Sequence, residues 1–141
     1  MRHVYECPMR WADMDVLGHV NNVTYVDYLQ EARVDMFALH EGPPSTEPRA
    51  EGLVVARNDI EFVRPLMLRA APIRIEMWVS RVRAASFTLA YEIVDEVDGE
   101  RVVYTRAWSD LTPFLFAEER PRRITDDERE FLTRYLEEPV A

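Results

Sequence analysis

The sequence contains no lysine and only one cysteine, and these two shortages exclude several kinds of chemistry. All 17 basic residues are arginines, so neither a Schiff-base lysine nor the lysine of a phosphate-binding loop is available. Cys7 has no cysteine partner with which to form an internal disulfide or a zinc site. With 26 acidic residues and a net charge of −9, the chain is not expected to bind nucleic acid.

Long apolar runs and several familiar catalytic loops are also absent. There is neither a run of about 18 apolar residues to cross a membrane nor an N-terminal segment with the form of a signal peptide. Together with the lone cysteine, this predicts a cytoplasmic protein with no membrane partner. A Gly-x-Ser-x-Gly elbow and a glycine-rich phosphate loop are missing, and His3, His19 and His40 lack metal-ligand spacing. We therefore expect no cofactor and no metal ion.

What is present suits one domain spanning all 141 residues, because 48% of them are hydrophobic and can fill a core. Apolar and polar residues alternate with a period of two in four segments, which predicts strands there. These segments are 54–63, 73–80, 86–94 and 101–112, and residues 3–11 also look extended. The turn-forming residues 95–100 favour an antiparallel hairpin between the last two strands.

Two other segments have the period of a helix. Apolar residues recur at spacings of three and four over residues 22–40, and Asn21 or Asn22 is a suitable N-cap. A second helix is predicted over residues 126–138, preceded by a capping box that begins at Thr125.

The order of these elements predicts an α+β fold. A five-stranded antiparallel sheet has one apolar face to bury, and the helix over 22–40 is the only long apolar element that can cover it. We expect the sheet to wrap around that helix, with the C-terminal helix added outside. The proline-rich loop over residues 41–52 is either a plain connector or a cover over a pocket mouth.

The candidate chemistry lies in the loop before the long helix. Two carboxylates and an imidazole follow one another in the pattern Asp13-x-Asp15-x-x-Gly18-His19. The free amides of a helix start carry partial positive charge and can polarise a carbonyl oxygen. A nearby carboxylate can attack that carbonyl or activate water. We expect Asp13 to be structural, holding the loop by hydrogen bonds.

This region resembles the signature of 4-hydroxybenzoyl-CoA thioesterase-like hotdog proteins. The similarity is carried by residues 10–33, RWADMDVLGHVNNVTYVDYLQEAR, and continues at residues 60–65, IEFVRP. It implies a hotdog fold and an acyl-CoA thioesterase, which would release a free acid and CoA. By this resemblance Asp15 is the general base or nucleophile, and the backbone amide of Asn22 polarises the thioester carbonyl. It also implies a homodimer or homotetramer with active sites between subunits.

Other candidate residues have open roles. The stretch His19-Val20-Asn21-Asn22 also resembles plant acyl-carrier-protein thioesterases, but Leu17 stands where those have an asparagine. His19 is therefore a candidate to polarise the substrate or bind Asp15, or it is an ordinary loop histidine. Four arginines near strand ends are candidates to receive the phosphates of CoA, or are plain surface charges. These are Arg64, Arg69, Arg81 and Arg83.

Three other functions stay open at this point. One is a non-enzymatic hotdog protein that binds acyl-CoA or acyl-carrier protein, another is a hotdog hydratase or dehydratase, and the third is an interaction domain with no small-molecule site. The acyl group, and the choice between CoA and a carrier protein, cannot be derived from the residues.

Overall fold

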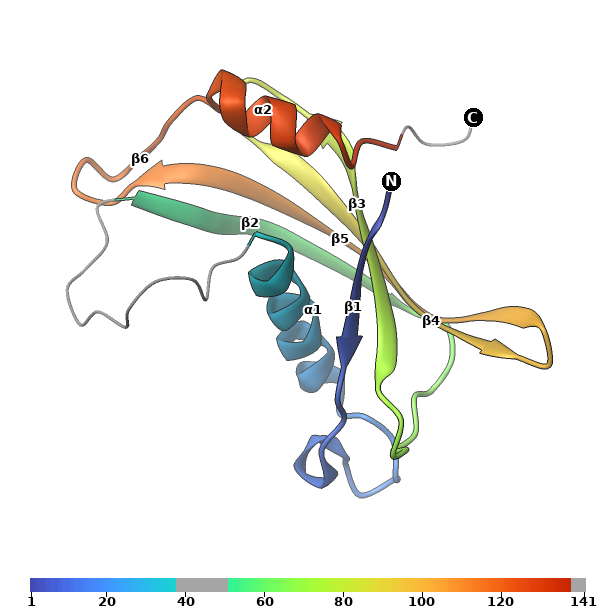
Figure 1. The fold of residues 1–141 in the computed structure, drawn as a ribbon. Coiled ribbons are helices and arrows are strands. Elements are labelled where there is room, and N and C mark those ends of the chain that lie inside the picture. Colours follow the sequence, from blue (N-terminus) through green and yellow to red (C-terminus); the bar gives the residue numbers. More distant parts are fainter. Residues whose placement is uncertain (38–50, 138–141) are drawn as a thin grey trace.

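The computed structural model describes residues 1–37 and 51–137. Its centre is one antiparallel sheet in the order β1–β3–β4–β5–β2, against which helix α1 packs (Figure 1). The main elements are β1 (His3–Cys7), α1 (Asn22–Met36), β2 (Glu51–Phe62), β3 (Ile73–Val82), β4 (Phe87–Val97), β5 (Glu100–Leu115) and α2 (Asp126–Thr133). A short 3-10 turn, η1 (Trp11–Asp13), and a two-residue strand, β6 (Arg120–Pro121), complete it. The predicted α+β hotdog fold is confirmed.

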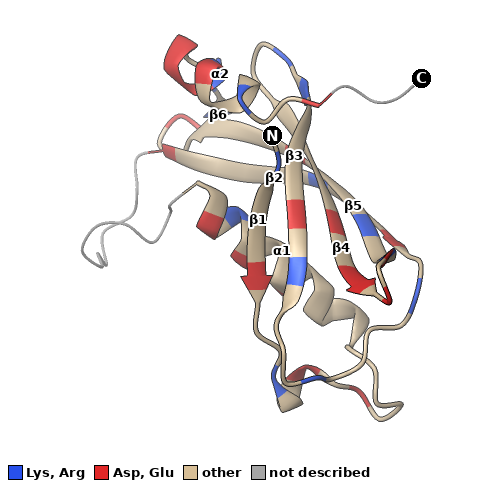
Figure 2. Ribbon diagram, turned by 45° about the vertical axis from the view of Figure 1, so that its right-hand side comes forward, with Lys and Arg blue, Asp and Glu red and all other residues tan. Residues whose placement is uncertain are grey.

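The core forms between α1 and the inner face of β3, β4 and β5. Alternate residues of the strands are buried there, as the period-two pattern predicts, and α1 adds its apolar stripe. The buried side chains include Ile73, Ile75, Met77, Val79, Phe87, Leu89, Tyr91 and Ile93 from the sheet, and Tyr25, Tyr28, Leu29, Ala32 and Met36 from α1. Charged residues stand at alternate positions of β3 (Figure 2), among them Glu76, which accepts hydrogen bonds from Arg2 and Arg101.

The predicted hairpin between the last two strands is present. β4 and β5 pair antiparallel up to Val97 opposite Glu100. The two residues between them, Asp98 and Gly99, have φ angles of 53° and 79°. Two successive residues with positive φ match the right-handed twist of paired strands, which is why an Asp-Gly pair closes this turn.

Several element ends differ from the predictions by a few residues. The long helix ends at Met36, where the amide of Phe37 donates to the carbonyl of Arg33; residues 38–40 and the proline-rich loop up to residue 50 lie outside the described residues. The first extended segment stops at Cys7, because Pro8 has no amide with which to continue the ladder.

The C-terminal helix is also shorter than predicted. It ends at Thr133. Beyond it, the amide of Val79 on β3 donates to the carbonyl of Tyr135 and the amide of Glu137 donates to the carbonyl of Val79, both at 2.9 Å. Pairing with the sheet satisfies the backbone groups that a longer helix would have used internally. In the described part of the chain, neither helix is long and apolar enough to span a membrane.

Candidate active site

Asp13 anchors the loop that precedes α1. Its carboxylate is 1% exposed and accepts hydrogen bonds from the hydroxyl of Tyr28 at 2.6 Å and from the amide and guanidinium of Arg10 at 2.9 and 2.8 Å. Burial alone would raise the pKa of Asp13, but the hydrogen bonds from Tyr28 and Arg10 outweigh it and hold the pKa below its ordinary value. This carboxylate is fully engaged, as the sequence predicted for a structural residue.

Asp15 closes the next turn of the same loop and keeps part of its carboxylate open. Its amide donates to the carbonyl of His19 at 2.9 Å, and its carbonyl accepts from the amide of Gly18 at 3.1 Å. One carboxylate oxygen, Oδ1, accepts from the amide of Leu17 at 2.8 Å and from that of His19 at 3.4 Å. In the described residues no hydrogen bond reaches the other oxygen, Oδ2. Backbone amides thus hold one oxygen of the side chain, and the other has no donor among the described residues.

The start of α1 supplies the second chemical feature. Asn21 is the N-cap: its side chain accepts from the amide of Val23 at 2.9 Å, and its carbonyl accepts from the amide of Thr24 at 2.9 Å. Asn22, the first helical residue, is exposed as a whole, and its amide donates no hydrogen bond to any described residue. The first amides of a helix have no intrahelical partner, so this one can receive an external oxygen.

Asp15 and the N-cap of α1 lie on the same open depression, which has a volume of about 760 Å³. It is lined by Trp11, Met14, Asp15, Val16, Gly18, Asn21 and Leu68. Apolar side chains crowd this end of the molecule: Trp11 is 81% exposed and Met67 62% exposed. A carboxylate and a helix start on one surface are the arrangement that attack on an activated carbonyl needs.

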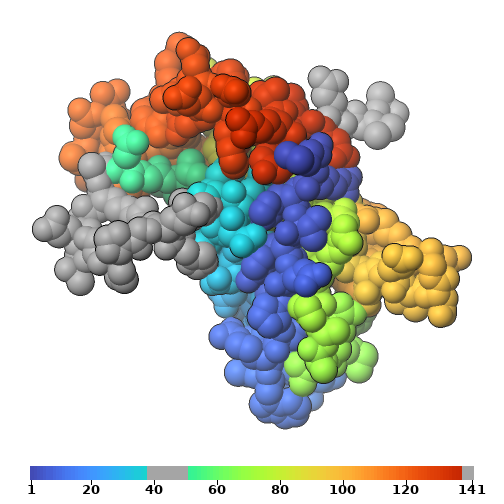
Figure 3. All heavy atoms as spheres, in the orientation of Figure 1, coloured from blue at the N-terminus to red at the C-terminus, as the bar shows by residue number. Residues whose placement is uncertain are grey.

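The far wall of the depression comes from the segment between β2 and β3. Val20 donates to the carbonyl of Leu66 at 2.8 Å, and His19 pairs with Met67 as an isolated bridge. Figures 1 and 3 show this segment beside the loop that carries Asp15. The half-buried ring of His19 makes no hydrogen bond with the described residues, so its role stays a prediction.

The structure separates the four arginines proposed for CoA. Arg69 is engaged by Asp95 and by the carbonyl of Pro72 at 2.8 Å. Arg64 is exposed and lies at the end of β2, on the segment that walls the depression. Arg81 and Arg83 lie at the far end of β3, and this ten-residue strand is about 30 Å long from its first residue to its last. These arginines therefore do not form one patch within a subunit.

Cys7 is not a candidate nucleophile. Its side chain is buried, and burial, helped by the nearby Asp13, raises the pKa of the thiol to about 11. A thiol that stays protonated at neutral pH is a poor nucleophile. Among the residues of the two described stretches, no three acidic, histidine or cysteine side chains gather closely enough to hold a metal ion.

Sequence reasoning missed the apolar side chains that line the depression. Trp11, Met14 and Leu68 look like ordinary apolar residues in the sequence, and nothing in their spacing joins position 68 to the loop at 11–18. The backbone contacts between residues 19–20 and 66–67 bring those segments together, and they are visible only in the folded chain.

Comparison with known proteins gives consistent matches. Residues 9–122 match the model of the thioesterase-like superfamily. A predicted thioesterase from Bacillus stearothermophilus has a similar structure, with a TM-score of 0.82 and 24% identity over 99% of this chain and 100% of that one. A mutant 4-hydroxybenzoyl-CoA thioesterase complexed with 4-hydroxybenzoyl-CoA has a TM-score of 0.77 and 19% identity, over 93% and 98% of the two chains.

One curated relative also matches. The uncharacterized protein YsmA from Bacillus subtilis (strain 168) is 30% identical over 92 residues. The matched segment covers 65% of this chain and only 60% of that protein.

Proposed function

This chain belongs to the thioesterase-like superfamily, and on that premise we propose that it hydrolyses the thioester of an acyl-CoA to a free acid and CoA. The observation that carries the proposal is the half-engaged carboxylate of Asp15, which opens on the same depression as the N-cap of α1. A neighbouring fold was solved as an aspartate-to-asparagine mutant with its CoA thioester bound, which supports an aspartate as the reacting group.

The reaction can be written from these two groups. The thioester carbonyl oxygen accepts a hydrogen bond from the amide of Asn22, whose partial positive charge stabilises the oxyanion of the tetrahedral intermediate. Asp15 takes a proton from water as the resulting hydroxide attacks the carbonyl carbon. The carbon–sulfur bond then breaks, and the thiolate leaves with the proton that Asp15 held.

A second route uses the same groups. Asp15 attacks the carbonyl carbon directly, the thiolate leaves, and water hydrolyses the mixed anhydride. Where water attacks the side-chain carbon of the anhydride, a single turnover in water labelled with oxygen-18 places solvent oxygen in the carboxylate of Asp15. General-base catalysis never labels that carboxylate, so label in Asp15 identifies direct attack. His19 lies beside Asp15 in the loop and is proposed only to assist, by polarising the substrate or orienting that carboxylate.

We propose a homodimer formed through the edge of the sheet. β2 is an edge strand whose Val55 and Phe62 are exposed, and an open apolar edge favours pairing with a second strand. A partner there would also border α1. A tetramer, or delivery of the acyl group by a carrier protein, remains a variant of this proposal.

The phosphates of CoA are assigned to Arg64 in this proposal. Its guanidinium is exposed, has no ion-pair partner among the described residues, and extends from the segment beside the depression. Arginine forks suit phosphate oxygens. Arg69 is held by Asp95, and Arg81 and Arg83 would need a second subunit to bring them near this site.

The test is a panel of acyl-CoAs of different length and branching, with release of free CoA thiol as the readout. The unsubstituted protein should hydrolyse at least one member, and Asp15→Ala should fall to background while Arg134→Met, an exposed change on the outer end of the molecule, should not. Hydration of an enoyl-CoA without thiol release would favour the hydratase. Tight binding without turnover, unaffected by Asp15→Ala, would favour the non-enzymatic binder.

A further inference from the structure

Arg33 is a buried cation on α1 that the proposed reaction does not use. The residue is 9% exposed, and its Nη1 donates to the hydroxyl of Tyr91 at 3.2 Å. That hydroxyl donates to Ser109 at 2.9 Å, and the serine hydroxyl donates to Oδ1 of Asn58 on β2 at 2.6 Å. The chain of hydrogen bonds holds the guanidinium in one place and leaves most of its donors unused.

The charge of Arg33 is not balanced within the described residues. The protein carries nine more acidic than basic residues, and Arg2, Arg10 and Arg101 all form ion pairs with carboxylates. No described carboxylate lies within ion-pair distance of Arg33. The C-terminal end of α1 and the Tyr91 hydroxyl offset only part of the cost of burying a cation, because a dipole is weaker than a full opposite charge.

Arg33 also lines a cavity. This cavity measures about 250 Å³ and is lined by Gln30, Arg33, Val34, Phe37, Leu53, Val55 and Leu111. Val55 belongs to the edge strand through which the homodimer is proposed, so the cavity borders that proposed interface. A second cavity of about 270 Å³ shares Phe37 and Leu53 with it. Apart from Gln30, the first cavity has apolar walls around one fixed cation, which suits an apolar chain that ends in an anion. The second cavity also carries Glu51, Arg122 and Glu128, so only the first is considered for the chain end.

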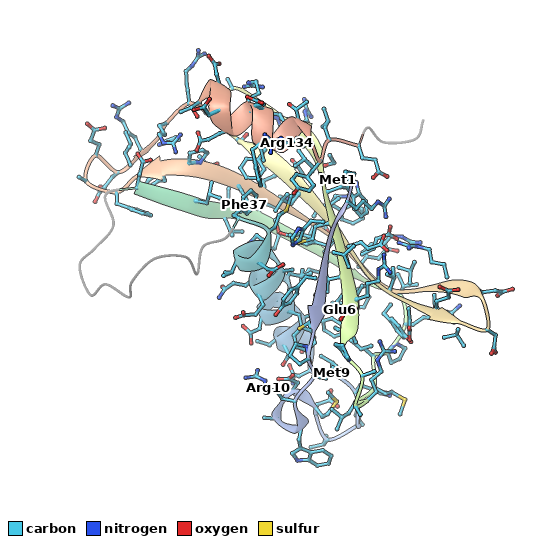
Figure 4. The ribbon with its side chains drawn as sticks, viewed as in Figure 1. Met1, Glu6, Met9, Arg10, Phe37 and Arg134 are labelled. Carbon is cyan, nitrogen blue, oxygen red and sulfur yellow. The ribbon has the colours of Figure 1, made fainter. Side chains whose placement is uncertain are left out.

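The position of this cavity relative to Asp15 sets the length of such a chain. α1 runs antiparallel along β2: Tyr25 packs on Phe62 with ring centroids 5.0 Å apart at the site end, and Phe37 meets Leu53 at the other. Figure 4 shows Phe37 at the opposite end of α1 from Met9 and Arg10. Arg33 lies eleven residues after Asn22, about 16 Å along the helix. The depression beside Asp15 and the cavity beside Arg33 are therefore separated by about the length of a long acyl chain.

We propose that Arg33 binds a carboxylate at the far end of the acyl group, so that the substrate class is a long ω-carboxyacyl thioester. This rests on the proposed thioesterase function for the position of the thioester, but recognition of the far carboxylate is a separate property. The guanidinium donates a charge-assisted fork to the carboxylate, and the apolar walls hold the methylene chain. An acyl group that ends in a methyl would leave the buried cation without an anion from the described residues.

The test measures binding, because binding does not require turnover. Acyl-CoA analogues with a methylene in place of the thioester sulfur are made in chain-matched pairs that end in a carboxylate or a methyl. By titration calorimetry the unsubstituted protein should bind the carboxylate member about 10- to 100-fold more tightly. Arg33→Met should remove the preference, while the control Arg134→Met, which changes an exposed arginine at the end of α2, should keep it.

Three outcomes would overturn the proposal: equal binding of the two analogues, binding of neither, and a preference that survives in Arg33→Met. If that variant keeps the preference and also loses self-association, the guanidinium pairs with a partner subunit instead. If Arg33→Met does not fold, Arg33→Gln serves the same comparison, because it keeps polarity and removes the charge.

Hydrolysis of the methyl-ended acyl-CoA reports separately on the proposed function. Turnover of that thioester with no carboxylate preference would retain the thioesterase and reject the role of Arg33. A clear preference for the carboxylate analogue with no turnover of any thioester would retain the role of Arg33 and reject the thioesterase.

Discussion

Two aspartates in one loop, two residues apart, lie in opposite surroundings. Asp13 faces inward, where Arg10 and Tyr28 occupy its oxygens. Asp15 faces outward, and backbone amides engage only one of its oxygens. The two carboxylates therefore differ in how many hydrogen-bond donors surround each of them, and the proposed function assigns them different roles. A fully satisfied carboxylate stabilises the fold, whereas a half-satisfied one beside a cavity is available to react.

The largest expected effect is on the activity of a variant at Asp15. Asp15→Asn should lower kcat by about 10²-fold or more, because it removes the proton acceptor or nucleophile, and should leave the melting temperature nearly unchanged. The asparagine oxygen can still accept from the amide of Leu17. Steady-state hydrolysis and a thermal melt on the same preparation check both halves. Full activity in this variant would remove Asp15 from the mechanism.

The reverse pattern is expected for Asp13→Asn. The new amide group would point a donor at the donors of Arg10 or Tyr28, so the free energy of unfolding should fall by about 2 kcal/mol. Urea denaturation followed by circular dichroism measures this change, with Asp15→Asn as the matched control. If the two variants lose equal stability, the distinction between the inner and outer carboxylates is wrong.

The free energy of unfolding should depend on pH through the carboxylate of Asp13. The pKa of Asp13 is lower in the folded protein than its ordinary value of about 3.9, so the unfolded state takes up its proton first as pH falls. The stabilisation from Asp13 is fully present above about pH 5 and is lost as the pH drops through the folded pKa. Asp13→Asn should therefore lose less stability than the unsubstituted protein between about pH 5 and about pH 3. Parallel pH profiles would contradict this.

The smallest effect tests the turn that aims Asp15. Gly18 and Gly99 both have φ of +79°, and open space lies where the methyl group of an alanine would point. An alanine at either position should therefore cost about 1 kcal/mol for the left-handed backbone. Only Gly18 donates to the carbonyl of Asp15. Gly18→Ala should lower kcat several-fold, while Gly99→Ala in the distant hairpin should not. Equal kinetics of the two variants would show that this turn does not position the carboxylate.

The sequence was most informative where a pattern repeats. The alternation through Ile73, Ile75, Met77 and Val79 predicted which face of β3 is buried, and all four side chains have no exposed surface. The family and the hotdog fold are confirmed, and the comparisons support the predicted class of enzyme, a thioester hydrolase. Periodicity works here because one face of each strand must be buried against α1.

Features that depend on tertiary contacts were not predictable. The last turn of the predicted C-terminal helix gives way to pairing with Val79, which no local propensity reports. Arg33 flanks the apolar stripe of α1, and its burial beside Tyr91 follows only from how the sheet curves over the helix. The roles of Asp15, Asn22 and His19, and the CoA contacts of Arg64, remain predictions.

In the proposed mechanism, the carboxylate at position 15 and the amide of Asn22 meet at one thioester. A crystal structure of Asp15→Asn with an uncleaved acyl-CoA measures this directly. The thioester carbonyl oxygen should lie about 3 Å from the amide nitrogen of Asn22, with the substituted side chain against the carbonyl carbon. A thioester bound elsewhere, with the depression beside position 15 empty, would contradict it.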